Sequence, residues 1–180
     1  MSAMGHTLSE DATDDSGALA GQTVVLRPTE ERHVDEFLAI LTEPEVARWW
    51  PGYDRERVAR ELIGAQCFAI EAFRETVGLI CFDEEDDPEY RHAGIDVALA
   101  PSAHGRGLGA DAVRTLARHL IVDRGHHRIA IDPAADNVKA IRSYERVGFR
   151  RVGVLRRYER GPDGTWHDGL LMDLLAEELG

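Results

Sequence analysis

The stretch from Gly94 to Phe149 constrains the fold most, because its pattern changes from strand to helix twice around a glycine-rich turn. A strand is expected over 94–100, and the turn Pro101–Gly107 follows it. The next residues place apolar side chains on one helix face, at Ala112, Val113, Leu116, Ala117, Leu120 and Ile121. Gly125 then favours the end of that helix. The pattern predicts a strand, a tight turn and an amphipathic helix in succession.

A second strand and helix complete this stretch. The strand is expected over Arg128–Asp132, where Pro133 stops it. Asn137 is expected to cap the following helix. The inner face of that helix is expected at Ala140, Ile141, Tyr144 and Val147, and Gly148 is expected to end it.

The turn itself is suited to binding an anion. Gly105-Arg106-Gly107-Leu108-Gly109 allows backbone N–H groups to converge, and the helix that starts there adds a partial positive charge. Arg106 adds a side-chain charge. The turn therefore predicts a site for a phosphate or pyrophosphate.

Three interpretations of the turn were compared. A Walker P-loop is excluded because the chain contains no GxxxxGK[ST]. Gly105, Gly107 and Ala110 also fit the dinucleotide-binding pattern, with Asp132 on the following strand. A tight connection without a ligand is the third interpretation.

Two motifs in order carry a family resemblance. His104–Gly109 follows the pattern [Gln/Arg]-x-x-Gly-x-[Gly/Ala] except at His104, and Asn137–Phe149 reads NVKAIRSYERVGF. Together they resemble the GCN5-related N-acetyltransferase (GNAT) family. The resemblance implies a mixed α+β fold with a central, mostly antiparallel twisted sheet, split by a V-shaped opening and flanked by helices. A single domain over 22–180 is expected to follow a flexible tail over 1–21.

The resemblance also implies acetyl-coenzyme A as the acyl donor, with coenzyme A as product. Val97 and Leu99 are expected to offer backbone groups to the pantetheine arm, and one N–H there could stabilise an oxyanion. The expected cofactor-binding residues are Val97, Leu99, His104, Gly105, Arg106, Gly107, Leu108, Gly109, Ala110, Asn137, Ala140 and Tyr144.

Two side chains are candidates for the chemistry. In the motif context, Tyr144 is expected to protonate the leaving thiolate, since a tyrosine is protonated at neutral pH. Asp96 interrupts an apolar strand, where a carboxylate needs a partner or a role. We expect Asp96 to bind the acceptor ammonium and pass its proton to water, and Asp132 to bind a second ammonium. A structural role was the alternative for each residue.

A narrower resemblance concerns the acceptor. Gly94-Ile95-Asp96, Asp132-Pro133, Asn137 with Arg142 and Tyr144, and Trp49-Trp50 look similar to the aminoglycoside 6'-N-acetyltransferases. The acidic run 83–89 is either a solvated turn or a contact for the acceptor, and Asp86 and Asp87 are the candidates for that contact. The expected substrate-binding residues are Trp49, Asp86, Asp87, Asp96 and Asp132.

The composition supports a cationic small-molecule amine as the substrate. The chain has 33 acidic and 21 basic residues and a net charge of −12, which disfavours nucleic acid. No apolar run approaches a membrane span, the start does not resemble a signal peptide, and a cytoplasmic protein is expected. Cys67 and Cys81 are expected to be buried free thiols in strands. No metal-site spacing occurs among the histidines, and both a monomer and a homodimer remain open.

Other functions stay open at this point. The same fold could acetylate a protein N-terminus or another metabolite amine, because the segment from Asp163 to Asp168 also resembles ribosomal-protein acetyltransferases. A non-catalytic acyl-coenzyme A-binding module is a third interpretation, which Tyr144 and Asp96 disfavour. An oxidoreductase is disfavoured because its glycine turn would come late, after antiparallel strands.

Overall fold

A computed structural model describes residues 17–180, in which eight strands form one sheet. The sheet order is β1-β2-β3-β4-β5-β6-β8-β7. Every neighbouring pair is antiparallel except β5 and β6, which are parallel. The strands are β1 (Leu19–Ala20), β2 (Val25–Pro28), β3 (Cys67–Ala72), β4 (Glu75–Glu85), β5 (His92–Leu99), β6 (Arg128–Ile131), β7 (Arg150–Arg160) and β8 (Trp166–Leu175).

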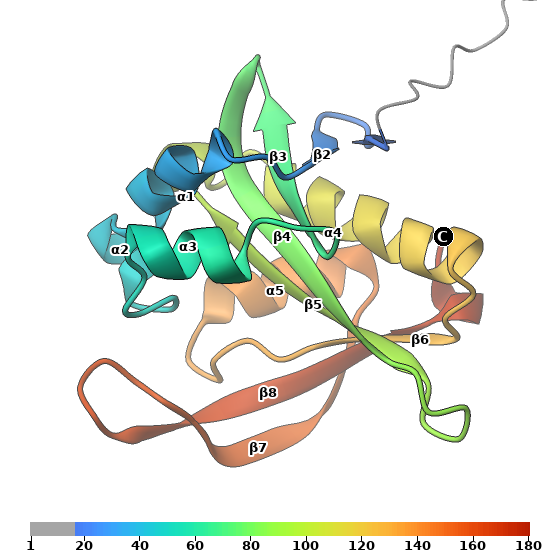
Figure 1. The fold of residues 1–180 in the computed structure, drawn as a ribbon. Helices are drawn as coiled ribbons and strands as arrows, with labels where there is room; N and C mark the ends of the chain where they lie inside the picture. Colours follow the sequence, from blue (N-terminus) through green and yellow to red (C-terminus); the bar gives the residue numbers. More distant parts are fainter. Residues whose placement is uncertain (1–16) are drawn as a thin grey trace, which may run out of the picture.

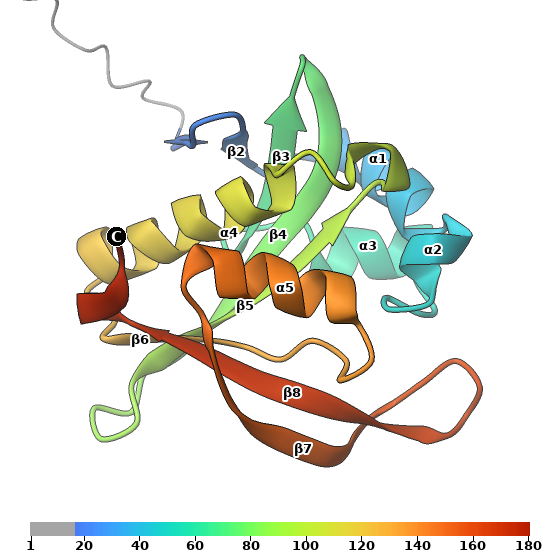
Figure 2. The same cartoon turned by 180° about the vertical axis from the view of Figure 1, so that it is seen from behind.

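Helices cover both faces of the sheet. One face carries α1 (His33–Leu41), α2 (Pro44–Ala47) and α3 (Arg55–Glu61), in front in Figure 1. The other face carries α4 (Leu108–Arg118) and α5 (Val138–Val147), in front in Figure 2. A π-helical turn, His119–Asp123, continues α4, and short 3-10 turns occur at Pro101–Ala103 and Ala176–Glu178. The expected α+β fold is confirmed.

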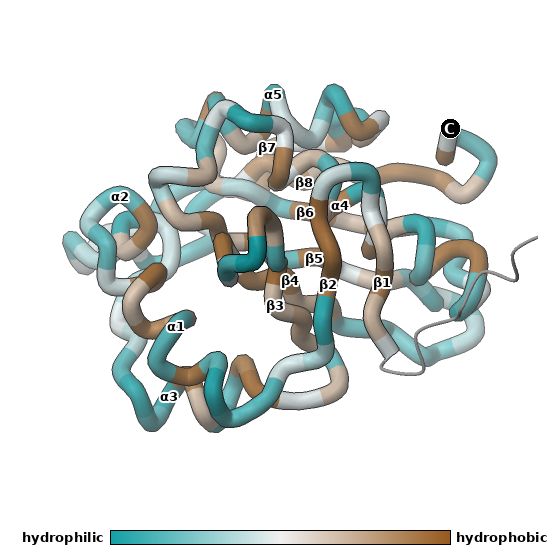
Figure 3. Tube along the Cα trace, turned by 90° about the horizontal axis from the view of Figure 1, so that it is seen from above, coloured by the Kyte–Doolittle hydropathy of each residue, from teal (hydrophilic) through white to brown (hydrophobic). Residues whose placement is uncertain are grey.

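Each face of the sheet has its own hydrophobic core. Leu108 and Leu116 of α4 and Ile141 of α5 pack on one face. Phe37 of α1 and Val58 of α3 pack on the other. The tube view agrees, because hydrophobic segments gather along the central strands while α1, α3 and α5 also carry hydrophilic segments outward (Figure 3). The sheet is therefore held from both sides.

Local sequence signals determine where α4 begins and where α5 begins and ends. Gly107 is left-handed, with φ 80°, directly before α4. The Asn137 side chain accepts a hydrogen bond from the Ala140 backbone N–H at 3.2 Å, which is the expected cap. Gly148, with φ 120°, ends α5. These predictions from glycine and asparagine positions are confirmed.

Asp111 anchors the start of the chain to α4. It is buried and accepts hydrogen bonds from the backbone N–H groups of Gln22, Thr23 and Val24, and from the Thr23 hydroxyl. Burial disfavours its charge, but these donors outweigh burial and hold the pKa of Asp111 below its usual value. The carboxylate thus stabilises the β1–β2 turn against the helix that follows the glycine loop.

The expected boundary of the N-terminal tail needs a correction. Leu19 and Ala20, placed in the tail by the sequence, form β1 and pair with Val25 and Leu26 of β2. A two-residue strand carries almost no periodicity, so the pattern gave no signal for it. Residues 1–16 lie outside the described residues.

The prediction of free thiols is wrong in this structure. Cys67 of β3 lies directly opposite Cys81 of β4, and the two side chains form a disulfide with a Cα–Cα distance of 4.1 Å. Both cysteines lie in strands, as expected. Their pairing depends on the β3–β4 register, which the sequence pattern did not provide.

Among residues 17–180, no helix combines the length and apolar character needed to cross a membrane.

Candidate active site

The sheet opens between β5 and β6. The two strands pair only at Ala93 with Ile129 and Gly94 with Ala130, so the later residues of β5 have no partner on β6. A cavity of about 1040 Å³ lies at this opening, lined by residues from both faces of the sheet. This is the V-shaped opening that the resemblance implied. Val97 and Leu99, expected to offer backbone groups, both line it.

The glycine loop forms one wall of the cavity. Gly105 and Gly107 have φ of 74° and 80°, and open space surrounds the position of an added Cβ at each. Within residues 17–180, the N–H groups of residues 105–107 donate no hydrogen bond. The first-turn N–H groups of α4 have no helical acceptors either. The loop therefore presents free donors at a helix N-terminus, which fits a pyrophosphate.

Most of the predicted loop residues line the cavity. These are His104, Gly105, Gly107, Leu108, Gly109 and Ala110. The His104 ring bonds the backbone oxygen of Leu99 at 3.1 Å. Arg106 does not line the cavity, because its guanidinium lies 4.2 Å from the ring centroid of Phe73 at the β3–β4 turn. The loop backbone, rather than Arg106, forms this wall.

Helix α5 brings Tyr144 to the same cavity. Asn137, Ala140 and Tyr144 all line it, as the motif implied. Tyr144 is buried, and its burial, together with the nearby carboxylates of Asp96 and Asp132, raises its pKa above the ordinary value for tyrosine. The phenol is therefore protonated at neutral pH and can donate a proton.

Three aspartates also line the cavity. They are Asp96 of β5, Asp132 just after β6, and Asp83 of β4. The Asp96 side chain is open to solvent on the cavity side but surrounded by protein elsewhere. Burial, followed by the charges of Asp132 and Asp83, raises the pKa of Asp96 to about 6. Such a carboxyl group is a better proton acceptor near neutral pH than an ordinary aspartate.

Asp83 occupies a space that Gly94 leaves open. Gly94 lies directly opposite Asp83 in the β4–β5 pair, and a Cβ at Gly94 would collide with the Asp83 carboxylate. The sequence predicted that the acidic run would reach the site, but it favoured the wrong members of the run. Asp86 and Asp87 are exposed in the β4–β5 loop and do not line the cavity.

Asp86 and Asp87 lie outside the cavity because β4 continues to Glu85 and carries the middle of the acidic run away from the cavity. Figure 1 shows the β4–β5 loop at the lower right, on the opposite side of the molecule from α2 and α3.

Tyr158 of β7 is a cavity residue that the sequence did not indicate. A hydrogen bond to Asp132, followed by burial and the carboxylate charges, raises the pKa of Tyr158 to about 12. The β7–β8 register shifts between Leu155 and Glu159, and Arg157 adopts a φ of 51°. The Arg157 N–H donates to Asp168 Oδ1 at 2.7 Å. This irregular segment turns Tyr158 toward Asp132.

Aromatic side chains cover another part of the cavity. Trp49, Trp50 and Tyr53 line it from the segment between α2 and α3. The Trp50 and Tyr53 rings lie 5.8 Å apart, and Arg48 lies over the Trp49 ring. Both tryptophans are half-buried and both line the cavity, whereas only Trp49 is among the expected substrate-binding residues. Trp49, which is expected to contact the acceptor, therefore lies at the cavity, and its contact with a substrate stays a prediction.

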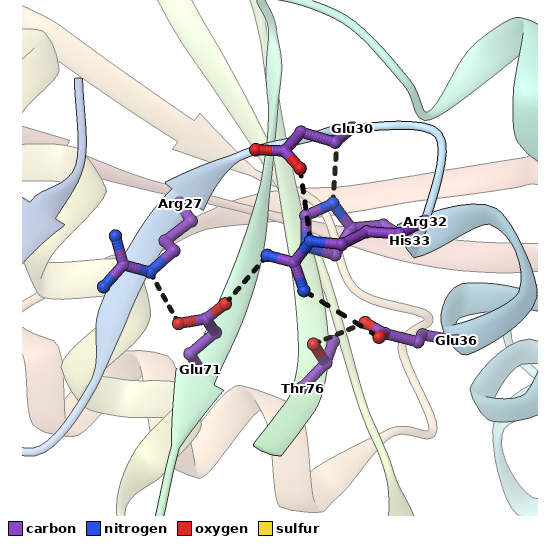
Figure 4. Close-up of polar contacts among 7 residues, drawn as sticks. All are labelled: Arg27, Glu30, Arg32, His33, Glu36, Glu71 and Thr76. Carbon is purple, nitrogen blue, oxygen red and sulfur yellow. Dashed lines mark hydrogen bonds and ion pairs between the residues drawn. The ribbon is translucent and has the colours of Figure 1, made fainter. Parts of the chain in front are cut away.

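A second, shallower hollow of about 660 Å³ lies near the β3–β4 turn. Arg32, Glu36 and Glu71, three of its charged residues, belong to one network of polar contacts (Figure 4). Glu71 bonds Arg27 at 2.7 Å and Arg32 at 3.4 Å, and Thr76 donates to Glu36 at 2.6 Å. This network ties α1 to β2, β3 and β4, and we assign it a structural role.

Comparison with known proteins identifies the family. The family model described as "Acetyltransferase (GNAT) domain" matches residues 23–150, and the chain therefore belongs to the GNAT acetyltransferases. Acetyl-coenzyme A is the acyl donor of this family. The glycine loop and α5 occupy the positions that the resemblance assigned to it.

Named relatives differ in their acceptors. The chain is 42% identical over 84 residues to a kanamycin resistance protein of Rhizobium radiobacter, covering 46% of this chain and 72% of that protein. It is equally similar over 84 residues to the aminoglycoside N(6')-acetyltransferase type 1 of Klebsiella pneumoniae, covering 39% of that protein. It is 30% identical over 162 residues to the mycothiol acetyltransferase of Corynebacterium efficiens, covering 83% of this chain and 52% of that protein.

A solved structure supports the fold over nearly the whole described chain. Mycobacterium smegmatis RimJ, in complex with CoA-disulfide, has a TM-score of 0.74 and 27% identity. The match covers 91% of this chain and 88% of that one.

Proposed function

We propose that the protein transfers an acetyl group from acetyl-coenzyme A to a primary amine of a cationic small molecule, with the 6'-amine of an aminoglycoside as the acceptor. The observation that carries this proposal is the cluster of Asp83, Asp96 and Asp132, which face the same cavity as the glycine loop and Tyr144. A substrate with several ammonium groups matches three carboxylates. The partial matches to kanamycin and aminoglycoside resistance proteins support the same acceptor.

Asp96 prepares the amine. An ammonium group is not nucleophilic, so it must lose a proton before it attacks. The Asp96 carboxylate binds the ammonium and accepts its proton, which its raised pKa favours near neutral pH. Asp132 and Asp83 hold further ammonium groups and so orient the reacting amine.

The remaining groups of the reaction act on acetyl-coenzyme A, the acyl donor. Acetyl-coenzyme A contributes the activated thioester, which the attacking amine cleaves. The loop N–H groups of residues 105–107 bind the pyrophosphate, and backbone N–H groups of β5 stabilise the oxyanion. The Tyr144 hydroxyl donates its proton to the departing sulfur, and the proton that the newly acylated nitrogen loses restores the hydroxyl. The protonated state of Tyr144 is secured by its raised pKa.

The aromatic wall adds binding energy for a sugar ring. Trp49 and Trp50 present flat apolar surface beside the carboxylates, and such surface packs against sugar rings and cations. We further propose that the protein works in the cytoplasm, where acetyl-coenzyme A is available.

Thiol release from acetyl-coenzyme A tests the proposal. The acceptors are kanamycin, tobramycin, a polyamine, the amine precursor of mycothiol and a peptide amine. We expect rapid release with the two aminoglycosides, and a larger rise of KM for Asp83→Asn than for Asp86→Asn, which removes a carboxylate outside the cavity. Release with the peptide amine alone would replace the proposal with acetylation of a protein N-terminus.

A further inference from the structure

Three cationic side chains lie along one face of α5. Lys139, Arg142 and Arg146 are three and four residues apart, the spacing that aligns side chains on a helix. All three are exposed and line the cavity. They cover roughly 10 Å of the helix, from the rise of 1.5 Å per residue. Figure 2 shows α5 beside α4, the helix that starts at the glycine loop.

The three side chains of this cationic face are unpaired in the part of the chain that the structure describes. Within residues 17–180, none of its three side chains has a hydrogen-bond or ion-pair partner. The other cations of the cavity are engaged, since Arg57 pairs with Glu61 at 2.9 Å and Arg160 donates to the Gly164 carbonyl at 3.2 Å.

The acidic residues in the segment that carries the cationic face pair with other elements. The segment 134–148 contains only Asp136 and Glu145 as acids. Asp136 pairs with Arg48 at 3.2 Å, and Glu145 pairs with Arg151 of β7 at 2.8 Å. Ion pairs that would neutralise the face are thus made with arginines from other elements, and three positive charges remain in a chain whose net charge is −12.

Such a face can bind an anionic group in addition to the one expected at the glycine loop. The loop offers backbone donors for one pyrophosphate. Coenzyme A carries one further phosphate, a monoester on its ribose, and arginine side chains bind such groups with paired donors. We propose that Lys139, Arg142 and Arg146 bind the 3'-phosphate and make the enzyme discriminate coenzyme A from dephospho-coenzyme A. This inference rests on the coenzyme of the family and not on the identity of the acceptor.

Calorimetric titration with coenzyme A and with dephospho-coenzyme A tests the inference without any acceptor. The wild-type protein is expected to bind coenzyme A about tenfold more tightly, the effect of one to two charge-assisted hydrogen bonds. Arg142→Gln and Arg146→Gln each reduce this preference, and the triple variant with Lys139→Gln abolishes it. Affinity for dephospho-coenzyme A stays unchanged, which also shows that the variants are folded.

Arg156→Gln is the matched control. Arg156 is exposed on β7 and lies outside the cavity lining, so its loss keeps the wild-type preference. Equal affinity of the wild-type protein for both ligands would overturn the inference. An equal loss of both affinities in the Arg142 and Arg146 variants would overturn it too, since the face would then not contact the 3'-phosphate. Neither result depends on whether an aminoglycoside is acetylated.

Discussion

Replacing Asp96 by asparagine should make the protein more stable at neutral pH while it loses activity. The pKa of Asp96 is raised from 3.8 to about 6 in the folded protein. Because the folded state holds this proton more tightly than the unfolded state does, the unfolding free energy falls as pH rises from 3.8 towards 6. Above that window the full cost of the charge remains. Asp96→Asn removes this cost.

The size of the change in unfolding free energy follows from the same pKa shift of Asp96. Each pKa unit corresponds to about 1.4 kcal/mol, so a fully enclosed group would cost ~3 kcal/mol. The Asp96 carboxyl is open to solvent on the cavity side, and screening reduces the value to about 1 kcal/mol. For a chain of this length, that raises the melting temperature by roughly 2–4 °C.

Urea unfolding at about pH 5 and pH 8 measures the effect. We expect Asp96→Asn to exceed the wild-type protein by about 1 kcal/mol at the higher pH and by less at the lower pH. Asp86→Asn, in the exposed β4–β5 loop, is the charge-matched control and should differ little at either pH. A variant that is less stable than wild type at pH 8, or a gain independent of pH, would refute the reasoning.

Four further predictions follow from single contacts. Tyr144→Phe should lower kcat roughly 100-fold with little change in coenzyme binding, measured by thiol release and calorimetry, and full turnover would exclude it as the acid. Asp111→Ala should lower the unfolding free energy by about 3 kcal/mol in urea, because three backbone N–H groups lose their acceptor; a loss within error would contradict the anchoring role. A hydrogen bond from Arg124 lowers the pKa of Glu84 to about 2; burial opposes this shift and His126 adds to it. The stabilisation from the ionised Glu84 is therefore fully present above pH 4.5 and is lost as the pH falls toward 2. The stability difference between wild type and Glu84→Gln should shrink across that range; a constant difference would argue against it. Reduction of the Cys67–Cys81 disulfide, which closes a separation of 14 residues, should cost about 3 kcal/mol by loop entropy, whereas the double serine variant should not respond to reductant.

Local signals explain why the donor side was predictable. A glycine turn, an asparagine cap and a helical period each act within a few residues, so His104–Ala110 and Asn137–Tyr144 were placed from the sequence. Asp96 and Asp132 were found because a charge in or beside an apolar strand needs an explanation. The assignment of these residues to the coenzyme, and the role of Tyr144 as the acid, came from the family resemblance and not from these local signals.

Features that depend on pairing between distant segments were missed. The disulfide needs the register that sets Cys67 opposite Cys81. Asp83 was not separated from its acidic neighbours because the end of β4 was not visible in a run of charges. Tyr158 reaches the cavity through an irregular stretch of β7, where the alternation of side chains breaks down. The acidic Asp111 on a buried helix face was a signal that could have been used.

One measurement tests the central claim most directly. Thiol release from acetyl-coenzyme A is followed with two aminoglycosides that differ only in an amine or a hydroxyl at the 6' position. The account predicts rapid release with the 6'-amine and a rate near background with the 6'-hydroxyl. Equal rates with both would show that another amine is acetylated, and no release with either, while coenzyme A still binds, would contradict the aminoglycoside acceptor.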